Sequence, residues 1–213
     1  MTSSDLYPEP WPGCRFLKLA AVFIVAWALS ASSVAADAKA IATAVCAPCH
    51  GEDGNSIIPM FPKIAGLQQD YIVKQLRDFR SGARGSDLMG PVANTLKPED
   101  IPSLAAYFSS KKMKPGVPGD KQAAGFGKMV YLDGNEETGV PACIGCHQAQ
   151  GAGHLIYPRI GGQHAAYVTH QMKDFASGER SNDFGRFMRS IARRMTAEEI
   201  QSVAEYLVGL GER

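Results

Sequence analysis

The chain repeats itself, and this repeat most strongly constrains its fold. Segment 61–89 and segment 157–188 carry the same residue types at matching places. The first copy's matching residues are Pro62, Ile64, Gly66, Tyr71, Gln75, Phe79, Gly82 and Arg84, and the second copy's are Pro158, Ile160, Gly162, Tyr167, Gln171, Phe175, Gly178 and Arg180. Roughly seventy residues of each half take part, which predicts two copies of one domain separated by small changes in loop length.

Each copy shows helical periodicity, and no segment alternates as a strand would. Apolar residues fall at i, i+4 and i+7 in both copies, which predicts one amphipathic helix in each. They are Ile72, Leu76 and Phe79 in the first copy and Val168, Met172 and Phe175 in the second. Gly82 and Gly178 follow these helices and indicate where they end.

A second helix is predicted near the end of each copy. The first opens at Pro98 and buries Ile101, Leu104, Ala105 and Phe108. The other opens at Thr196, which has capping-box spacing to Glu199. It buries Ile200, Val203, Ala204 and Leu207. With a short helix expected around 38–44 and another around 122–131, the sequence predicts an all-α protein.

These patterns divide the chain into a first domain at 37–112, a linker at 113–120 and a second domain at 121–213. The linker is rich in proline and glycine. Each domain is small enough for its apolar core to be thin, so a large apolar cofactor is expected to complete it.

The first 36 residues differ in kind from the rest. Arg15 and Lys18 precede an apolar run at 19–29, and small residues including Val34 and Ala36 follow. This order predicts a cleaved signal peptide at 1–36, and hence export. The alternative is an uncleaved anchor, but a membrane span needs about 20 apolar residues. A formal charge of +1 gives no indication of nucleic acid as a partner.

Two short motifs carry the chemistry. "CAPCH" contains Cys46, Cys49 and His50, and "CIGCH" contains Cys143, Cys146 and His147. Cys-x-x-Cys-His is the attachment signature of c-type haem, in which two thiols bond the porphyrin and the histidine binds iron. We therefore expect two haem c groups. A zinc site and disulfides are the alternatives. Spacing leaves a disulfide between the repeats open, but neither alternative explains the histidines.

Each iron needs a ligand on its other face. Met89 and Met188 are predicted to supply it, because they lie 39 and 41 residues after His50 and His147 and match each other in the repeat. Met172 belongs to an apolar stripe. Four others have no methionine at the matching position: Met60, Met113, Met129 and Met195.

The remaining histidines are not expected to bind iron. His164 and His170 align with Gln68 and Lys74 and are expected to be solvated, while His154 has no counterpart.

A ligating histidine usually donates its second N–H to a carbonyl. Pro62 and Pro158 follow the two motif histidines by twelve and eleven residues and could carry that carbonyl, although both could be simple turn prolines. Six other repeated side chains either contact haem propionates or are solvated helix positions. They are Tyr71, Gln75, Arg84, Tyr167, Gln171 and Arg180.

The whole chain after the signal peptide resembles the dihaem cytochrome c4 family of bacterial periplasms. The resemblance is carried by "CAPCHGEDGNS", "FPKIAG", "QLRDFRSGAR", "DIPSLAAYF", "PACIGCH", "GGQHAAYV" and the two methionines. It implies two tandem cytochrome c-like helical domains related by pseudo-twofold symmetry, each wrapped around a haem. It also implies iron ligation by His50 with Met89 and by His147 with Met188. The change from Leu67 to Gln163 is a departure that bears on potential tuning.

An iron with both faces occupied transfers electrons and binds no substrate, so we expect an electron-transfer protein and not an enzyme. The resemblance implies a periplasmic carrier, loosely held at the membrane, between a cytochrome bc complex and a terminal oxidase. Two alternatives remain at this point. One is a dihaem peroxidase, which needs a displaceable ligand. The other is the haem subunit of a larger enzyme, such as a flavocytochrome sulfide dehydrogenase.

Overall fold

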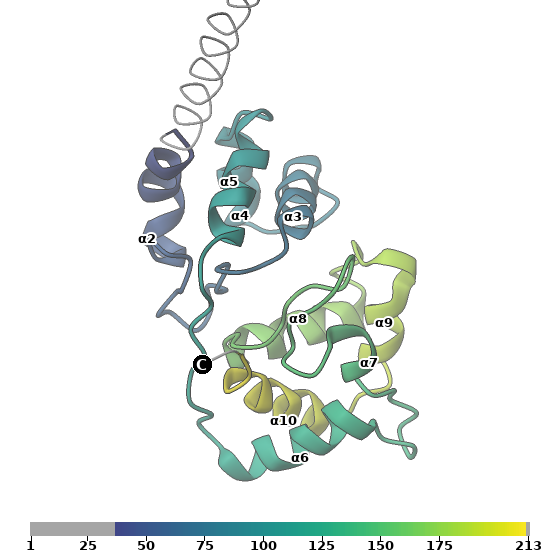
Figure 1. The fold of residues 1–213 in the computed structure, drawn as a ribbon. Coiled ribbons are helices and arrows are strands. Elements are labelled where there is room, and N and C mark those ends of the chain that lie inside the picture. Colours follow the sequence, from purple (N-terminus) through teal and green to yellow (C-terminus); the bar gives the residue numbers. More distant parts are fainter. Residues whose placement is uncertain (1–36, 212–213) are drawn as a thin grey trace, which may run out of the picture. The chain divides into compact units, whose positions relative to one another are not determined.

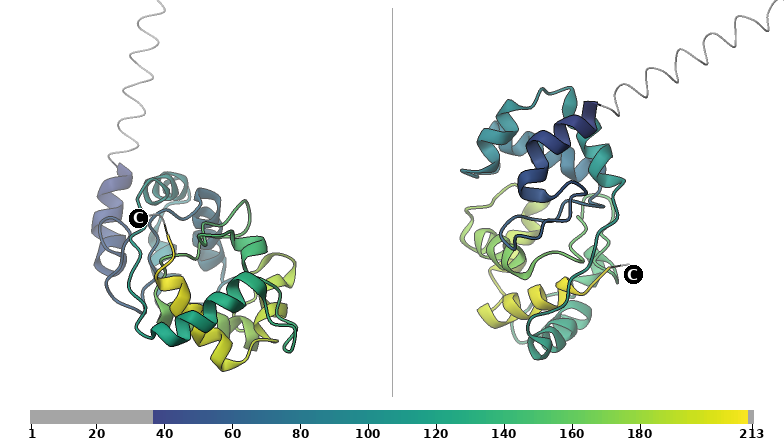
Figure 2. Two further views of the ribbon diagram at one scale, coloured as in Figure 1. Left: turned by 60° about the horizontal axis from the view of Figure 1, so that its bottom comes forward. Right: turned by 90° about the vertical axis from the view of Figure 1, so that its left-hand side faces the viewer.

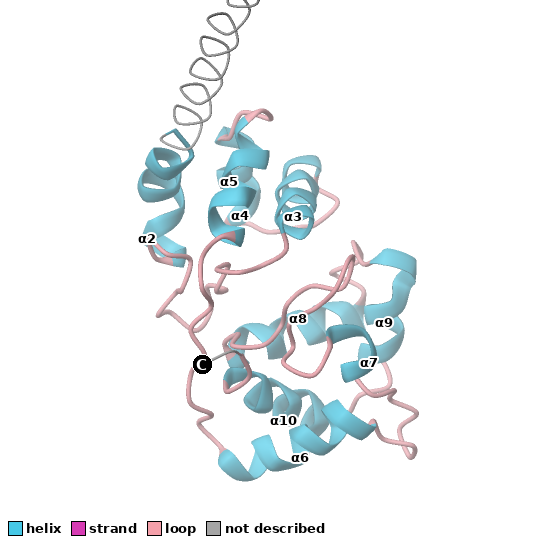
Figure 3. Cartoon of the chain, in the orientation of Figure 1, coloured by secondary structure: helices cyan, strands magenta, loops and turns pink. Residues whose placement is uncertain are grey.

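The computed structural model describes residues 37–211, shown in Figure 1, so the predicted signal peptide at 1–36 lies outside the described residues. From Ala38 onward these residues belong to one compact unit. Within residues 37–211 the regular elements are all helices (Figure 3), accompanied by two isolated bridges. The predicted all-helical class is confirmed. No helix in this part of the chain has the length and apolarity needed to cross a membrane.

The first half begins with a helix that reaches the first motif. Residues 37–41 are helical and continue into the π-helix η1 (Ala42–Cys46) and then into α2 (Ala47–His50). The other helices are α3 (Gln69–Ser81), α4 (Met89–Thr95) and α5 (Asp100–Ser109). All four apolar residues predicted to face inward from α5 are buried, and with Ala42 and Ile72 several of them form this half's core.

The second half has an equivalent set of helices. They are α6 (Lys121–Asp133), α7 (Ile144–His147), α8 (Ala165–Ser177), η2 (Phe184–Arg186), α9 (Phe187–Ala192) and α10 (Ala197–Val208). The predicted inner face of α10 is buried against α6. The predicted capping box is present, since Glu199 N donates to Thr196 Oγ1 and Thr196 N donates to the Glu199 carboxylate.

The two halves share details of backbone geometry as well as helix order. Gly66 N donates to Phe108 O at 2.9 Å, and Gly162 N donates to Leu207 O at 2.8 Å. Gly82 and Gly178 end α3 and α8 with φ of 77° and 88°, a left-handed conformation that glycine adopts without steric cost.

The halves differ in the segment that leads into each motif, and a single connection joins them. In the second half, a loop at 134–143 separates α6 from α7, whereas η1 runs directly into α2. Residues 113–120 lie in the connection between α5 and α6 and form no helix or strand (Figure 2). This connection is fixed in place, because Gly116 N donates to Val208 O at 2.8 Å and Met113 is buried.

Candidate haem sites

The first motif sits where a widened helical turn meets a short helix. Cys46 is the last residue of η1, and His50 is the last residue of α2. His50 is 7% exposed, and its Nδ1 lies 2.8 Å from Pro62 O. Because a carbonyl only accepts hydrogen bonds, Nδ1 carries the proton, and the lone pair is on Nε2. Burial lowers the pKa of His50 and outweighs the opposing effect of this carbonyl. The imidazole is therefore neutral near pH 7, which suits a metal ligand.

The second motif reproduces this geometry. His147 is also 7% exposed, and its Nδ1 lies 2.9 Å from Pro158 O. Burial again lowers the pKa of this histidine against the effect of the carbonyl. Both proline carbonyls are thus within hydrogen-bond distance of the motif histidines, so neither proline is only a turn residue.

The four motif cysteines are free thiols and form no disulfide. In each half the first cysteine is partly buried and the second is exposed. Burial raises the pKa of Cys46 and of Cys143 to about 11, so both stay protonated at neutral pH. Within residues 37–211, no three His, Cys, Asp or Glu side chains are grouped to hold a metal ion. This arrangement does not favour the zinc and disulfide alternatives.

The predicted methionine ligands occupy equivalent helices. Met89 is the first residue of α4, where its N–H donates a hydrogen bond to Ser86 Oγ at 3.0 Å. Met188 is the second residue of α9. Both are partly buried and belong to neither apolar core. By contrast Met113 is 6% exposed, and Met60 and Met129 are more than half exposed.

The segments beside these predicted ligands expose large apolar side chains. In the first half they are Ile57, Ile58, Met60 and Leu88, and in the second half they are Leu155, Ile156, Phe184 and Phe187. Such side chains suit the walls of a site for an apolar ring. Together with two thiols, a neutral imidazole and a thioether in each half, they make a donor set that fits haem c.

The repeated polar side chains of α3 and α8 form one network that joins the halves. Arg84 Nη1 donates to Gln75 Oε1 at 2.7 Å within its own half. Its Nη2 donates across to Tyr167 Oη at 2.9 Å and to Gln171 Oε1.

Arg180 makes the reciprocal set of contacts. Its Nη1 donates to Gln171 Oε1 at 2.7 Å, and its Nη2 donates to Tyr71 Oη at 3.1 Å. These side chains are therefore not solvated helix positions.

Both guanidinium groups are buried, and neither forms a salt bridge among the described residues. Burial would raise the pKa of Tyr71, but the positive charges of Arg180 and Arg84 lower it overall. Buried cations are normally paired with anions. This interface therefore has the charge needed to receive carboxylates.

Other contacts between the halves were also not predicted from the sequence. Gln163 forms a buried amide pair with the backbone of Lys63, with both hydrogen bonds 2.9 Å long. The only signal was that glutamine replaces Leu67 of the first copy. His164 was expected to be solvated, and that expectation is wrong, because its Nε2 lies 2.8 Å from Ser56 O.

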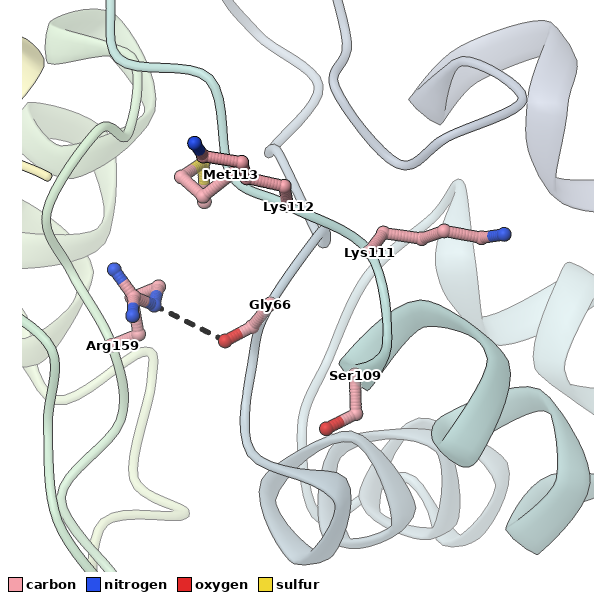
Figure 4. Close-up of a pocket in the computed structure, with 6 residues that line it drawn as sticks. All are labelled: Gly66, Ser109, Lys111, Lys112, Met113 and Arg159. Carbon is pink, nitrogen blue, oxygen red and sulfur yellow. Dashed lines mark hydrogen bonds between the residues drawn. The ribbon is translucent and has the colours of Figure 1, made fainter. Parts of the chain in front are cut away.

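A separate cavity of about 200 Å³ lies beside the connection between the halves (Figure 4). Arg159 crosses it to donate from Nε to Gly66 O at 3.1 Å. It is lined by Gly66, Ser109, Lys111, Lys112, Met113 and Arg159. None of these is a predicted thiol or iron ligand, so this cavity is not the haem site.

Comparison with known proteins shows which family this chain belongs to. The model of the family described as cytochrome c matches twice, at residues 35–112 and 127–211. A cytochrome c4 from Thiocapsa roseopersicina is 42% identical over 82% of this chain and 91% of its own length. The chain belongs to the cytochrome c4 family. The reduced recombinant cytochrome c4 from Pseudomonas stutzeri, a crystal structure, matches with a TM-score of 0.78 and 37% identity, over 83% of this chain and 98% of its own.

Membership of the cytochrome c4 family establishes the general function, which is electron transfer. Each cytochrome c domain carries its own Cys-x-x-Cys-His motif, so the protein holds two haem c groups and transfers electrons. A further relative, from Stutzerimonas stutzeri, is named a thiosulfate dehydrogenase electron acceptor and is 35% identical over 89% of this chain and 94% of its own length.

Proposed function

We propose that this dihaem cytochrome carries single electrons in the periplasm from a cytochrome bc complex to a haem–copper terminal oxidase, loosely held at the membrane surface. The observation that carries this proposal is the duplicated site. In each half a buried, neutral histidine is oriented by a proline carbonyl, and a methionine lies on the equivalent later helix. The iron of a bound haem gains and loses one electron. A site closed on both faces does this without binding substrate.

In this proposal each ligand has one role. Cys46 and Cys49 bond the first haem, and Cys143 and Cys146 bond the second. The iron ligands are His50 with Met89 in the first half and His147 with Met188 in the second. The Pro62 and Pro158 carbonyls fix the tautomer and orientation of the histidines. The domains are proposed to span 37–112 and 121–213, joined by 113–120, after removal of 1–36.

Arg84 and Arg180 are proposed to neutralise haem carboxylates from both halves. Haem carries carboxylate groups, and guanidinium groups bind carboxylates with charge-assisted hydrogen bonds. Both arginines are buried and donate to neutral oxygens, and neither forms a salt bridge within the described part of the chain, although the negative charge of Asp174 helps to raise the pKa of Arg84.

The ligand assignment is tested by replacing Met89 or Met188 with alanine. Each change should make one haem high-spin and lower its potential by roughly 0.1–0.3 V, about 2–7 kcal/mol for one electron. Visible spectra and a redox titration measure both effects. Met129→Ala is the matched control, because Met129 is 58% exposed on α6 and should leave both haems unchanged. Unchanged spectra in both ligand variants would refute the assignment.

A second candidate differs only in the electron donor. The similarity to a thiosulfate dehydrogenase electron acceptor favours a carrier that serves a periplasmic dehydrogenase. The flavocytochrome alternative is a related case in which the dehydrogenase is a bound subunit. Purification of the native protein distinguishes these possibilities, because a bound flavin subunit would co-purify. A separate dehydrogenase would instead reduce the purified carrier during turnover. No observation favours the peroxidase alternative.

A further inference from the structure

The two peptide groups that orient the motif histidines also bond a glutamine of the opposite half. In the first half, the carbonyl of the peptide between Pro62 and Lys63 lies 2.8 Å from His50 Nδ1. The N–H of this same peptide belongs to Lys63, and it donates to Gln163 Oε1 at 2.9 Å. One planar amide therefore connects the histidine of one half to a glutamine of the other.

The second half has the same arrangement in the opposite direction. The carbonyl of the peptide between Pro158 and Arg159 lies 2.9 Å from His147 Nδ1. The N–H of this peptide belongs to Arg159, and it donates to Gln68 Oε1 at 2.9 Å. Each half thus supplies a side-chain oxygen to the peptide that orients the other half's histidine.

The orientation of each glutamine amide follows from its partners. A backbone N–H only donates and a carbonyl only accepts, so the amide oxygen faces the N–H in both cases. Gln163 Nε2 donates to Lys63 O, and Gln68 Nε2 donates to Ala152 O, both at 2.9 Å. Gln163 and Lys63 are 6% and 7% exposed, so water has little access to their contact.

The two glutamines make this bond from positions that do not match in the repeat. Gln163 aligns with Leu67, and Gln68 aligns with His164. A contact that was only copied by duplication would come from aligned residues. The same bond made from different positions indicates that it has a role in both halves.

We propose that Gln163 lowers the reduction potential of the first haem and that Gln68 lowers that of the second, each as a positioning residue that acts across the interface. A hydrogen bond to the N–H of an amide polarises the group and strengthens the bond that its carbonyl accepts, by about 10–30%. A stronger bond to Nδ1–H makes the imidazole a more basic ligand, which stabilises ferric iron. The inference rests on the proposed function, because it requires His50 and His147 to be iron ligands.

The test replaces each glutamine of the holoprotein with methionine, which keeps the side-chain length and removes the amide. Gln163→Met should raise the potential of the first haem and leave the second unchanged, and Gln68→Met should do the reverse. The expected change in the reduction equilibrium is about threefold, which is about 28 mV at 59 mV per tenfold change for one electron.

Proton NMR during a redox titration measures the two potentials separately, because the haem methyl signals of each half are followed individually. The signals that change in the Met89→Ala variant identify the first haem. A second measurement is the resonance of the His50 Nδ1 proton in the reduced, diamagnetic protein. It should move upfield in Gln163→Met because its hydrogen bond weakens, whereas a generally loosened interface would not single out one histidine.

The matched control is His164→Phe, which also removes a hydrogen bond between the halves, to Ser56 O, but bonds neither proline peptide. It should leave both potentials unchanged. Gln163→Glu keeps an acceptor oxygen for the Lys63 N–H, so the potential of the first haem should not rise in that variant. If Gln163→Met fails to fold, Gln163→Glu and Gln68→Met decide.

Each glutamine is judged by its own variant. No shift, a fall in potential, an equal shift of both haems or a shift confined to the glutamine's own half would overturn the proposal for that residue. Failure of the ligand assignment has a different signature. Unchanged spectra in the Met89→Ala and Met188→Ala variants would contradict the assignment itself, whereas methionine ligation with unmoved potentials in the glutamine variants would contradict only this inference.

Discussion

Replacing Arg84 with methionine tests the network that joins the halves, because methionine keeps much of the side-chain volume but donates no hydrogen bond. Three bonds are lost, to Gln75, Tyr167 and Gln171, and the last two cross between the halves. Hydrogen bonds from charged groups contribute about 1.5–3 kcal/mol each, so simple addition gives at least about 4.5 kcal/mol.

The remaining contacts reduce this value. Gln75 Oε1 still accepts from Asn182 Nδ2 at 3.1 Å, and Gln171 Oε1 still accepts from Arg180 Nη1 at 2.7 Å. Only the Tyr167 hydroxyl loses its one protein partner. We therefore expect the free energy of unfolding to fall by about 3 kcal/mol.

Urea unfolding of the holoprotein, followed by Soret absorbance and near-ultraviolet circular dichroism, measures this change. Arg84→Lys is the control, since lysine keeps the charge and should recover part of the loss. Arg180→Met should cost a similar amount. The double variant should cost more than the sum of the two, because each single variant leaves the other arginine bonded to Gln75 and Gln171, whereas the double variant removes both donors. A loss below about 1 kcal/mol in Arg84→Met would refute the reasoning.

Two further predictions concern the second half. A Cβ at Gly127 would lie 1.9 Å from Ser202 O, so Gly127→Ala should push α6 away from α10 and lower thermal stability. A Cβ at Gly125 would meet open space, so Gly125→Ala should raise stability by up to about 1 kcal/mol. Equal melting temperatures of the Gly127→Ala and Gly125→Ala variants would contradict this packing. Glu199 is 1% exposed, and although burial raises its pKa, hydrogen bonds from Thr196, Thr138 and Asn135 lower the pKa overall. Its stabilisation should be complete above its unfolded pKa of about 4.3 and should be lost as pH falls through the lower folded value. The difference in unfolding free energy between the unaltered chain and Glu199→Gln should therefore narrow in acid, and a difference independent of pH would argue against this role.

Features that depend on local periodicity could be predicted from the sequence. The inner faces of α5 and α10 follow from apolar spacing. The helix ends follow from Gly82 and Gly178, and the cap follows from the spacing of Thr196 to Glu199. The distance from His50 to Pro62 along the chain was enough to suggest a hydrogen bond, because the same spacing nearly recurs in the second copy.

Contacts between the halves could not be predicted in the same way. His164 meets Ser56, which is 108 positions away, and nothing in the local pattern of either residue indicates the other. The sequence suggested propionate contacts for Arg84 and Arg180, but it gave no sign that each arginine also bonds a tyrosine of the opposite half. A repeat shows that two residues are equivalent, and it leaves open whether they meet.

The reciprocal arginine bonds affect how such a tandem protein can evolve. The arginine of each half donates a hydrogen bond to a tyrosine hydroxyl that the other half provides. Splitting the gene between the domains would expose both arginines to water and remove the hydrogen bonds that each makes to the other half, so selection should keep the halves on one polypeptide. Duplication supplied two similar parts, and their mutual dependence explains why the pair would stay fused.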